Sequence, residues 1–330
     1  MSAQILKDQP VDLDCAKKIL SAGLSVCLPT ETVYGLACNA LDEVAVKKVF
    51  EIKNRPLTDP LIVHVDSLEM ACSVAVLSDR ALHLVEYFWP GPLTIILPKK
   101  ACVPSIVCAG LPTVGVRLPA NNLMQKVINR CGFPLATPSA NPFGYISPTR
   151  FESVVKTLGD RVAGIFDGGN CEFGVESTVV DLTDPKKVLI LRPGPVSSDQ
   201  IEAVLSEPVL TKSVQNSTET VSVSPGQHSK HYSPKTPLFI FEDNLPCDTN
   251  VNDAIIYLKK TEHKGGNLYY LSEQGNWEEI CSSLFDLLFC LDQNNTISRI
   301  FIQVVLDDHP YAQVYWDRVK RAAVKSDFSR

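Results

Sequence analysis

The sequence lacks the cysteine pattern of a zinc site or of a secreted, disulfide-rich protein. Its 330 residues include 11 cysteines, an odd number, and no C-x-x-C pair. Some of them stand in apolar runs, where this small side chain is usually buried, namely Cys27, Cys72, Cys281 and Cys290. We therefore expect free thiols, no protein-bound metal and a reducing, cytoplasmic environment.

Long apolar stretches and an excess of positive charge are also missing. No uninterrupted apolar run approaches the ~20 residues of a membrane-spanning helix. The first residues, MSAQILKDQPVDLD, do not combine a basic region with an apolar core as a secretion signal does. The formal net charge of −6 argues against a general affinity for nucleic acid, because that affinity depends on cations that neutralise phosphates. We expect no membrane association and no strong direct nucleic-acid binding, although a local basic pocket is compatible with this charge.

Two common nucleotide-binding motifs are absent as well. The sequence contains neither G-x-x-x-x-G-K-[ST] nor G-x-G-x-x-G, so it indicates neither a P-loop nor a dinucleotide-binding fold. Any phosphate must instead be held by side chains and by loops at strand ends.

What the sequence does contain is a large apolar fraction arranged in alternating short runs. With 45% hydrophobic residues and this length, the chain can bury the cores of two α/β domains. We expect strands at 24–28, 61–65, 93–97, 113–118, 133–137, 163–166, 179–182, 188–191, 238–241, 254–258, 268–271 and 299–305. We expect helices at 12–20, 44–52, 121–131, 151–158, 199–205, 277–291 and 311–324, and two more between 67 and 88.

A change in composition predicts the domain boundaries. Residues 211–236 are rich in Ser, Thr, Gln, Asn and Pro and show no apolar period, which is typical of a linker. We therefore predict a catalytic domain at 1–210, a linker at 211–236 and a smaller α/β domain at 237–330.

The stretch from Leu28 to Val65 is the most informative part of the chain. Its order is strand, loop, helix, basic loop and strand, beginning LPTETVYGLACNA and ending KNRPLTDPLIVHV. Hydroxyls of Thr30 and Thr32 and cations of Lys53 and Arg55 would meet at one edge of a sheet, where open α/β sheets usually bind ligands. From the residues alone, however, Lys53 and Arg55 are better explained as two solvated cations after a helix, and Thr32 as the cap of the next helix.

Other polar residues allow two interpretations each. His64 lies in an apolar strand, where a histidine is more often a core residue than a ligand contact. Arg117 ends a strand and suits a two-pronged grip on a carboxylate, or an ordinary salt bridge. Ser177 has no G-x-S-x-G motif around it and no motif that supplies a histidine base, so covalent catalysis is disfavoured. His228 and His231 are three residues apart, but the nearby prolines argue against the helix that a shared zinc ion would need.

Several of these segments together identify a resemblance to a known family. The segments PTETVYGL, KNRP and PLIVHV, in this order, resemble the YrdC-like family, and SPGQHSKHYSP and LRPGP resemble its two-domain members. The resemblance covers nearly the whole chain. It implies a twisted mixed sheet with helices, a smaller C-terminal α/β (Rossmann-like) domain, and a long linker that folds over the active site.

The resemblance also implies a role for individual residues. It implies catalytic roles for Lys53 and Arg55 and an L-threonine pocket formed by Thr32, His64, Arg117, Thr137 and Ser177. It implies an ATP site formed by Arg55, Asp59, Thr113, Ser139, Asn141, Ser147, Arg192 and Tyr232. Individually, the signals for Thr113, Ser139, Asn141, Ser147 and Arg192 are weak, since turns and strand ends commonly carry such residues.

The implied reaction joins L-threonine, bicarbonate or carbon dioxide, and ATP into L-threonylcarbamoyladenylate with release of pyrophosphate, and ATP would bring Mg²⁺. The product would pass to a separate transferase that modifies tRNA next to the anticodon. Two alternatives remain open, a double-stranded RNA-binding module of the same fold and a carbamoyltransferase that uses carbamoyl phosphate through an adenylate. A larger enzyme of the latter kind has zinc-finger-like cysteine pairs, which this chain lacks.

Overall fold

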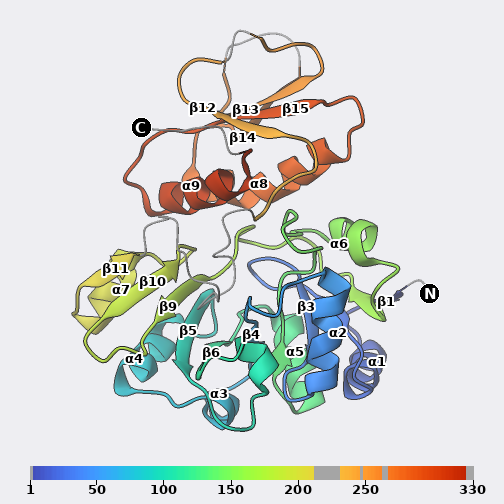
Figure 1. The fold of residues 1–330 in the computed structure, drawn as a ribbon, viewed down its shortest axis with the longest axis vertical. Coiled ribbons are helices and arrows are strands. Elements are labelled where there is room, and N and C mark those ends of the chain that lie inside the picture. The colour runs from blue at the N-terminus through green and yellow to red at the C-terminus, as the bar shows by residue number, and fades with distance from the viewer. Residues whose placement is uncertain (1–2, 212–230, 246–247, 262–266, 325–330) are drawn as a thin grey trace.

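The computed structural model has two α/β parts, each built around its own sheet (Figure 1). It describes residues 3–211, 231–245, 248–261 and 267–324. The larger part carries an 11-stranded sheet, and the smaller part carries a four-stranded one. This arrangement confirms the predicted α/β class and its two-domain layout.

The large sheet is mixed and has the strand order β1-β8-β2-β3-β7-β4-β6-β5-β9-β10-β11. In its middle, β3, β7 and β4 pair antiparallel, whereas β4 and β6 pair parallel in a register that sets His64 opposite Arg117. Its strands are β1 (Gln4–Leu6), β2 (Val26–Leu28), β3 (Gly35–Asn39), β4 (Ile62–His64), β5 (Leu93–Pro98), β6 (Thr113–Arg117), β7 (Leu135–Ala136), β8 (Gly164–Phe166), β9 (Thr178–Asp181), β10 (Val188–Arg192) and β11 (Val209–Thr211).

Helices cover the faces of this sheet, and local capping explains where several of them begin and end. The Asp42 side chain accepts hydrogen bonds from the first amides of α2, and Asn121 does the same for α5, which ends at Gly132 in the left-handed conformation. The helices are α1 (Pro10–Ser21), α2 (Glu43–Lys53), α3 (Leu68–Val74), α4 (Asp79–Phe88), the 3₁₀ turn η1 (Ser105–Cys108), α5 (Asn122–Cys131), α6 (Phe151–Leu158) and α7 (Ser198–Leu205).

The smaller part consists of four parallel strands and two helices. Its strands are β12 (Leu238–Phe241), β13 (Asp253–Lys259), β14 (Asn267–Ser272) and β15 (Arg299–Gln303), in the order β12-β15-β13-β14. The helices α8 (Trp277–Asp292) and α9 (Pro310–Ala322) lie between this sheet and the larger part of the molecule (Figure 1). Both helices therefore face the larger part.

Two cysteine predictions are wrong. Cys27 and Cys281 are buried as expected, but Cys72 and Cys290 are exposed, because they fall on the outward faces of α3 and α8. Every cysteine that the structure describes is a free thiol. Among the described residues no helix is long and apolar enough to cross a membrane.

The segment after Thr32 also differs from its prediction. Thr32 does not cap a helix: β3 follows it, and α2 begins only at Glu43 with Asp42 as its cap. The short strands β1, β3 and β11 were not predicted. The partner of β1, β8, is remote in sequence, whereas β3 pairs with the nearby β2 as well as the remote β7, and β11 pairs with the preceding strand β10. Most of the predicted linker at 211–236, including His228, lies outside the described residues, and the domain boundaries remain a prediction.

Candidate active site

A cavity of about 540 Å³, its open mouth included, lies where central strands of the large sheet end. Loops after β2, β7 and α2, the last residues of β4, β6 and β10, and the segment before β9 all reach it. It is lined by Thr30, Thr32, Val33, Gly35, Arg55, Ile62, His64, Arg117, Thr137, Pro138, Ser139, Glu176, Ser177, Arg192 and His231.

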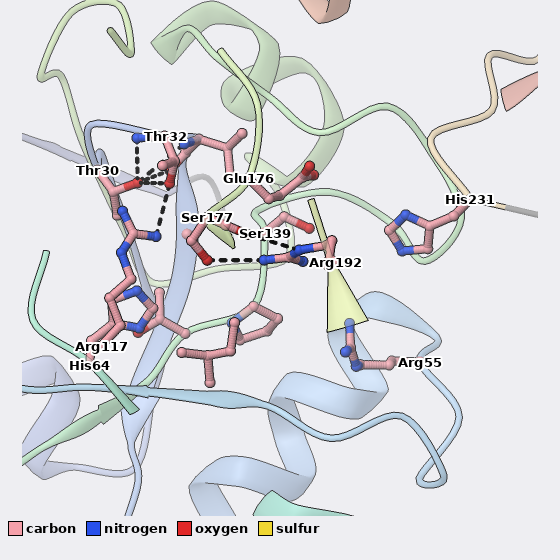
Figure 2. Close-up of a pocket in the computed structure, with 15 residues that line it drawn as sticks. Thr30, Thr32, Arg55, His64, Arg117, Ser139, Glu176, Ser177, Arg192 and His231 are labelled. Atoms are coloured by element: carbon pink, nitrogen blue, oxygen red, sulfur yellow. Dashed lines mark hydrogen bonds between the residues drawn. The ribbon is translucent and has the colours of Figure 1, made fainter. Parts of the chain in front are cut away.

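The polar residues divide this cavity into two ends (Figure 2). Thr30, Thr32, Arg117 and His64 lie together on one side, which we call the hydroxyl end. Arg55 and His231 lie on the opposite side, which we call the cation end, with Ser139, Ser177 and Arg192 between the two. Such a site presents hydrogen-bonding groups to one part of a ligand and positive charge to another.

Arg117 is the centre of the hydroxyl end. Its Nη1 donates to Thr32 Oγ1 at 3.0 Å, its Nη2 pairs with Glu31 Oε1 at 2.6 Å, and its Nε donates to the carbonyl of Gly91 at 3.1 Å. Burial raises the pKa of Glu31, but Arg117 outweighs this effect and holds it below its ordinary value. The salt bridge considered as an alternative role for Arg117 is thus present, and it fixes the guanidinium against the cavity.

Arg55 at the cation end is held by its own loop. Its Nη2 pairs with Asp59 Oδ2 at 2.9 Å and donates to the carbonyl of Pro60 at 2.8 Å. Lys53 does not line the cavity; its buried Nζ donates to the carbonyls of Ser139 and Asn141. Burial and the nearby Arg55 lower the pKa of Lys53 well below its ordinary value. Lys53 therefore ties the loop of residues 138–141 to the end of α2.

Arg192 sits between the two ends and is fixed by Ser177. Its Nε donates to the Ser177 carbonyl at 3.1 Å and its Nη2 to Ser177 Oγ at 3.0 Å. The same hydroxyl lies 2.8 Å from Thr94 Oγ1. Neither partner is a base, so the surroundings of Ser177 suit a hydrogen-bonding residue and not an activated nucleophile.

The two histidines of the cavity are neutral. Burial, followed by the charge of Arg117, lowers the pKa of His64 well below its usual value. Burial and then Arg55 do the same to His231. Within the described residues, three ring nitrogens have no hydrogen-bond partner: Nδ1 and Nε2 of His64, and Nδ1 of His231. These nitrogens are available to a polar ligand.

The remaining predicted site residues lie outside the cavity lining. Asn141 donates to the carbonyls of Pro142 and Tyr145, and Ser147 Oγ donates to Glu176 Oε1 at 2.6 Å. Tyr232 is fully buried beside His231. Thr113 begins β6, whereas the cavity residue Arg117 ends it, so the two are separated by the length of that strand. The structure thus brings together Thr32, Arg55, Arg117, Ser139 and Ser177 and leaves Thr113 apart.

Three charged residues near the cavity were not predicted. Glu31 pairs with Arg117, Glu176 lines the wall, and Arg318 of α9 pairs with Glu176. The position of Glu31 and Glu176 next to Thr32 and Ser177 was a usable signal, because neighbours of site residues share their loop. Arg318 stands in an ordinary helical sequence and carries no such signal.

The cavity has no ligand set for a resident metal ion. No group of three or more His, Cys, Asp or Glu side chains in the described part of the chain could hold one. Its carboxylates are instead engaged by arginines.

An α/β protein with a mixed sheet and a polar, arginine-lined cavity at its strand ends belongs to the class that binds small anionic substrates. The family model Sua5_yciO_yrdC, described as telomere recombination, matches residues 18–194, and the model described as threonylcarbamoyl-AMP synthase, C-terminal domain, matches residues 196–324. The chain belongs to this YrdC-like family, and the resemblance seen in the sequence is confirmed.

Relatives and a solved structure extend this likeness over most of the chain. Proteins named threonylcarbamoyl-AMP synthase from Pyrococcus abyssi and Bacillus subtilis are 38% and 39% identical over 292 residues, which is 84% of this chain and 84% of each relative. The crystal structure of P. abyssi Sua5 complexed with L-threonine superposes with a TM-score of 0.87, at 32% identity and 98% coverage of both chains.

Proposed function

We propose that this chain is a threonylcarbamoyl-AMP synthase, an enzyme that forms L-threonylcarbamoyladenylate from L-threonine, bicarbonate or carbon dioxide, and ATP. The observation that carries the proposal is the single cavity that joins a hydroxyl end to a cation end. The relatives that bear this name are similar to the chain over most of its length. The double-stranded RNA-binding alternative has no observation in its favour among the described residues.

The hydroxyl end suits the amino acid. A guanidinium next to hydroxyls can bind a carboxylate through charge-assisted hydrogen bonds, and Arg117 is held in place for this by Glu31 and Thr32. Thr137 and Ser177 line the neighbouring wall. His64 is neutral, so it can offer a hydrogen bond to threonine but is a poor proton acceptor.

The cation end, together with Arg192 in the middle of the cavity, suits the triphosphate. Arg55 and Arg192 can hold phosphate oxygens and offset the charge that builds up on pyrophosphate as it leaves. Asp59 positions Arg55, and Lys53 holds the loop that carries Ser139. Asn141, Ser147 and Tyr232 would support this end, and the ATP would bring Mg²⁺ bound to its own phosphates. The position of Thr113 gives no support to an ATP contact.

In the reaction, the threonine amine adds to carbon dioxide and loses a proton, which forms a carbamate. A carbamate oxygen then attacks the α-phosphorus of ATP, and the bond from that phosphorus to the bridging oxygen breaks as pyrophosphate departs. Because no base is placed for the proton, it passes to solvent or to a phosphate. The residues contribute mainly by holding both substrates in line, which can offset much of the entropic cost of bringing them together. The product would then serve a separate tRNA threonylcarbamoyltransferase.

Pyrophosphate release with ATP tests this function directly. We expect release only when L-threonine and bicarbonate are both present. Release without threonine would instead support a carbamoyltransferase, and no release under any combination would contradict the proposal.

Two matched substitutions test the assignment of the two ends. Arg117→Lys keeps the charge but loses the two-pronged geometry, so we expect the KM for threonine to rise by about tenfold or more, with less effect on the KM for ATP. For Arg192→Lys we expect the opposite: a large rise in the KM for ATP and a smaller effect on the KM for threonine. Arg130→Lys, on an exposed arginine paired with Asp14, serves as the control and should change neither constant.

A further inference from the structure

The helix α9 of the smaller part reaches the wall of the cavity. Its Arg318 is 0% exposed and is the largest of the fully buried side chains among the described residues. Such a cation is stable inside a protein only when buried anions and carbonyls compensate it. Its partners therefore indicate what this helix holds in place.

Arg318 contacts three segments outside its own helix, two in the larger part and one that carries Tyr232. Its Nε donates to Glu176 Oε2 at 2.9 Å, and its Nη2 donates to the carbonyl of Pro193 at 2.9 Å. Its guanidinium also lies over the ring of Tyr232, 5.3 Å from the centroid. On its own helix, Nη1 donates to Asp317 Oδ2 at 2.6 Å. Each of the three guanidinium nitrogens thus donates a hydrogen bond.

Two of these partners are next to groups of the cavity. Glu176 lines the wall and precedes Ser177, while its other oxygen accepts from Ser147. Pro193 follows Arg192, the cation that donates to Ser177. One side chain from α9 therefore fixes both loops that bring Arg192 and Ser177 together.

The backbone of the same helix holds a third cavity residue. The carbonyl of Arg321, one turn after Arg318, accepts a hydrogen bond from the His231 amide at 3.2 Å. His231 lines the cation end (Figure 2). No contact of Arg318 reaches Thr32 or Arg117 at the hydroxyl end. The influence of α9 is therefore directed at the middle of the cavity and at its cation end.

We propose that Arg318 is a positioning residue for Arg192 and the neighbouring cation end: through Glu176 and the Pro193 carbonyl it sets Arg192 and makes the smaller domain part of the ATP site. The assignment to ATP rests on the function proposed above. If Arg318 served only global stability, its substitution would change the KM values of both substrates alike. As a positioning residue, it should affect the KM for ATP more than the KM for threonine.

Steady-state kinetics of full-length variants test the proposal. Arg318→Met removes the charge and all three hydrogen bonds of the guanidinium, so we expect the KM for ATP to rise by about tenfold or more. The KM for threonine should rise clearly less, because Ser177 borders the threonine site but Arg117, the proposed carboxylate partner, has no contact with Arg318. Arg318→Lys keeps the charge but cannot reach both Glu176 and Pro193, so a smaller change with the same bias is expected. In a Glu176→Gln background, Arg318→Met should raise the KM for ATP by a smaller factor than it does in the unmodified protein, because the two residues act as a unit.

The control is Lys320→Met, which removes an exposed cation from the same helix and should leave both constants unchanged. If Arg318→Met does not fold, Arg318→Lys and Glu176→Gln decide the question. Equal changes in both KM values, or none in these folded variants, would overturn the inference. Absence of pyrophosphate release by the unmodified protein would instead overturn the proposed function.

Discussion

Three buried arginines border the cavity, and they differ in how their charge is balanced. Arg55 pairs with Asp59 and Arg117 with Glu31, but no carboxylate in the described chain forms an ion pair with Arg192, which donates to Ser177 instead. Burial lowers the pKa of Arg192, as expected for a cation in such a place. A buried charge without an ion pair is costly, so a bound anion should be stabilised most strongly beside Arg192.

The neutral histidines predict how stability depends on pH. The pKa values of His64 and His231 are lowered in the folded state, so above a pH of about 6.5 both are neutral whether the chain is folded or not. As the pH falls below that value, the unfolded chain binds protons that the folded chain excludes. We expect the free energy of unfolding to drop by up to about 1.4 kcal/mol per histidine for each pH unit, measured by urea denaturation.

Substitution of the same residues provides the comparison. The double variant His64→Gln/His231→Gln should lose less stability than the unmodified protein between about pH 7 and pH 5.5, because its glutamines do not titrate. His83→Gln, at an exposed position of α4, is the control and should behave like the unmodified protein. An identical pH dependence in the double variant would show that other groups cause the loss.

At the scale of elements, the site depends on two loops packed without space between them. A Cβ atom added at Gly194 would lie 2.3 Å from the Thr178 amide nitrogen, 2.6 Å from the Ser177 carbonyl carbon and 2.7 Å from the Glu176 carbonyl oxygen. All three are backbone atoms, so no side-chain rotation can relieve the contact. Only glycine allows the loop after Arg192 to lie against the segment that precedes β9.

Gly194→Ala should therefore damage the cation end. We expect the two loops to separate, with a loss of about 1–3 kcal/mol in stability typical of overpacking and an increase in the KM for ATP. Thermal unfolding and pyrophosphate release measure the two effects. Gly164→Ala is the matched control, because its added Cβ would approach the ends of flexible side chains. Equal losses of activity in both variants would contradict this interpretation.

The elements that the sequence predicted are those that carry their own signals. The helix α5 has its Asn121 cap and Gly132 terminus within a few residues, so local pattern was sufficient. The strand β3 is short and buried on both faces, and it pairs with the remote β7 as well as with the nearby β2, so part of its pairing depends on a distant segment. Missing β3 also led to the wrong capping role for Thr32.

At the scale of the whole molecule, a similar distinction separates the predicted cavity arginines from Arg318, which was missed. Arg117 and Arg192 end strands and Arg55 follows the end of α2, and the family resemblance marked those positions. Arg318 meets Glu176 across 142 positions of sequence, in a contact that exists only because the two domains dock. No local pattern in α9 could reveal it.

The docking of the two domains also depends on Gly174, which lies two residues before the cavity residue Glu176. A Cβ added there would lie 2.4 Å from the Ser282 carbonyl oxygen and 2.6 Å from the Ser282 Cα atom, both in the backbone of α8. Gly174 also has a φ of +63°, which an alanine adopts only with strain. Substitution at this position therefore combines local strain with a direct clash between the domains.

Gly174→Ala should loosen α8 and α9 from the larger domain. We expect faster amide hydrogen exchange in both helices and, because Arg318 then loses Glu176, a higher KM for ATP. Gly132→Ala separates strain from clash, since Gly132 has a φ of +76° but no atom within 4 Å of the added Cβ. That control should lose about 1 kcal/mol of stability without faster exchange in α8. If both variants change exchange in α8 equally, strain alone explains the result and the contact between Gly174 and Ser282 does not govern docking.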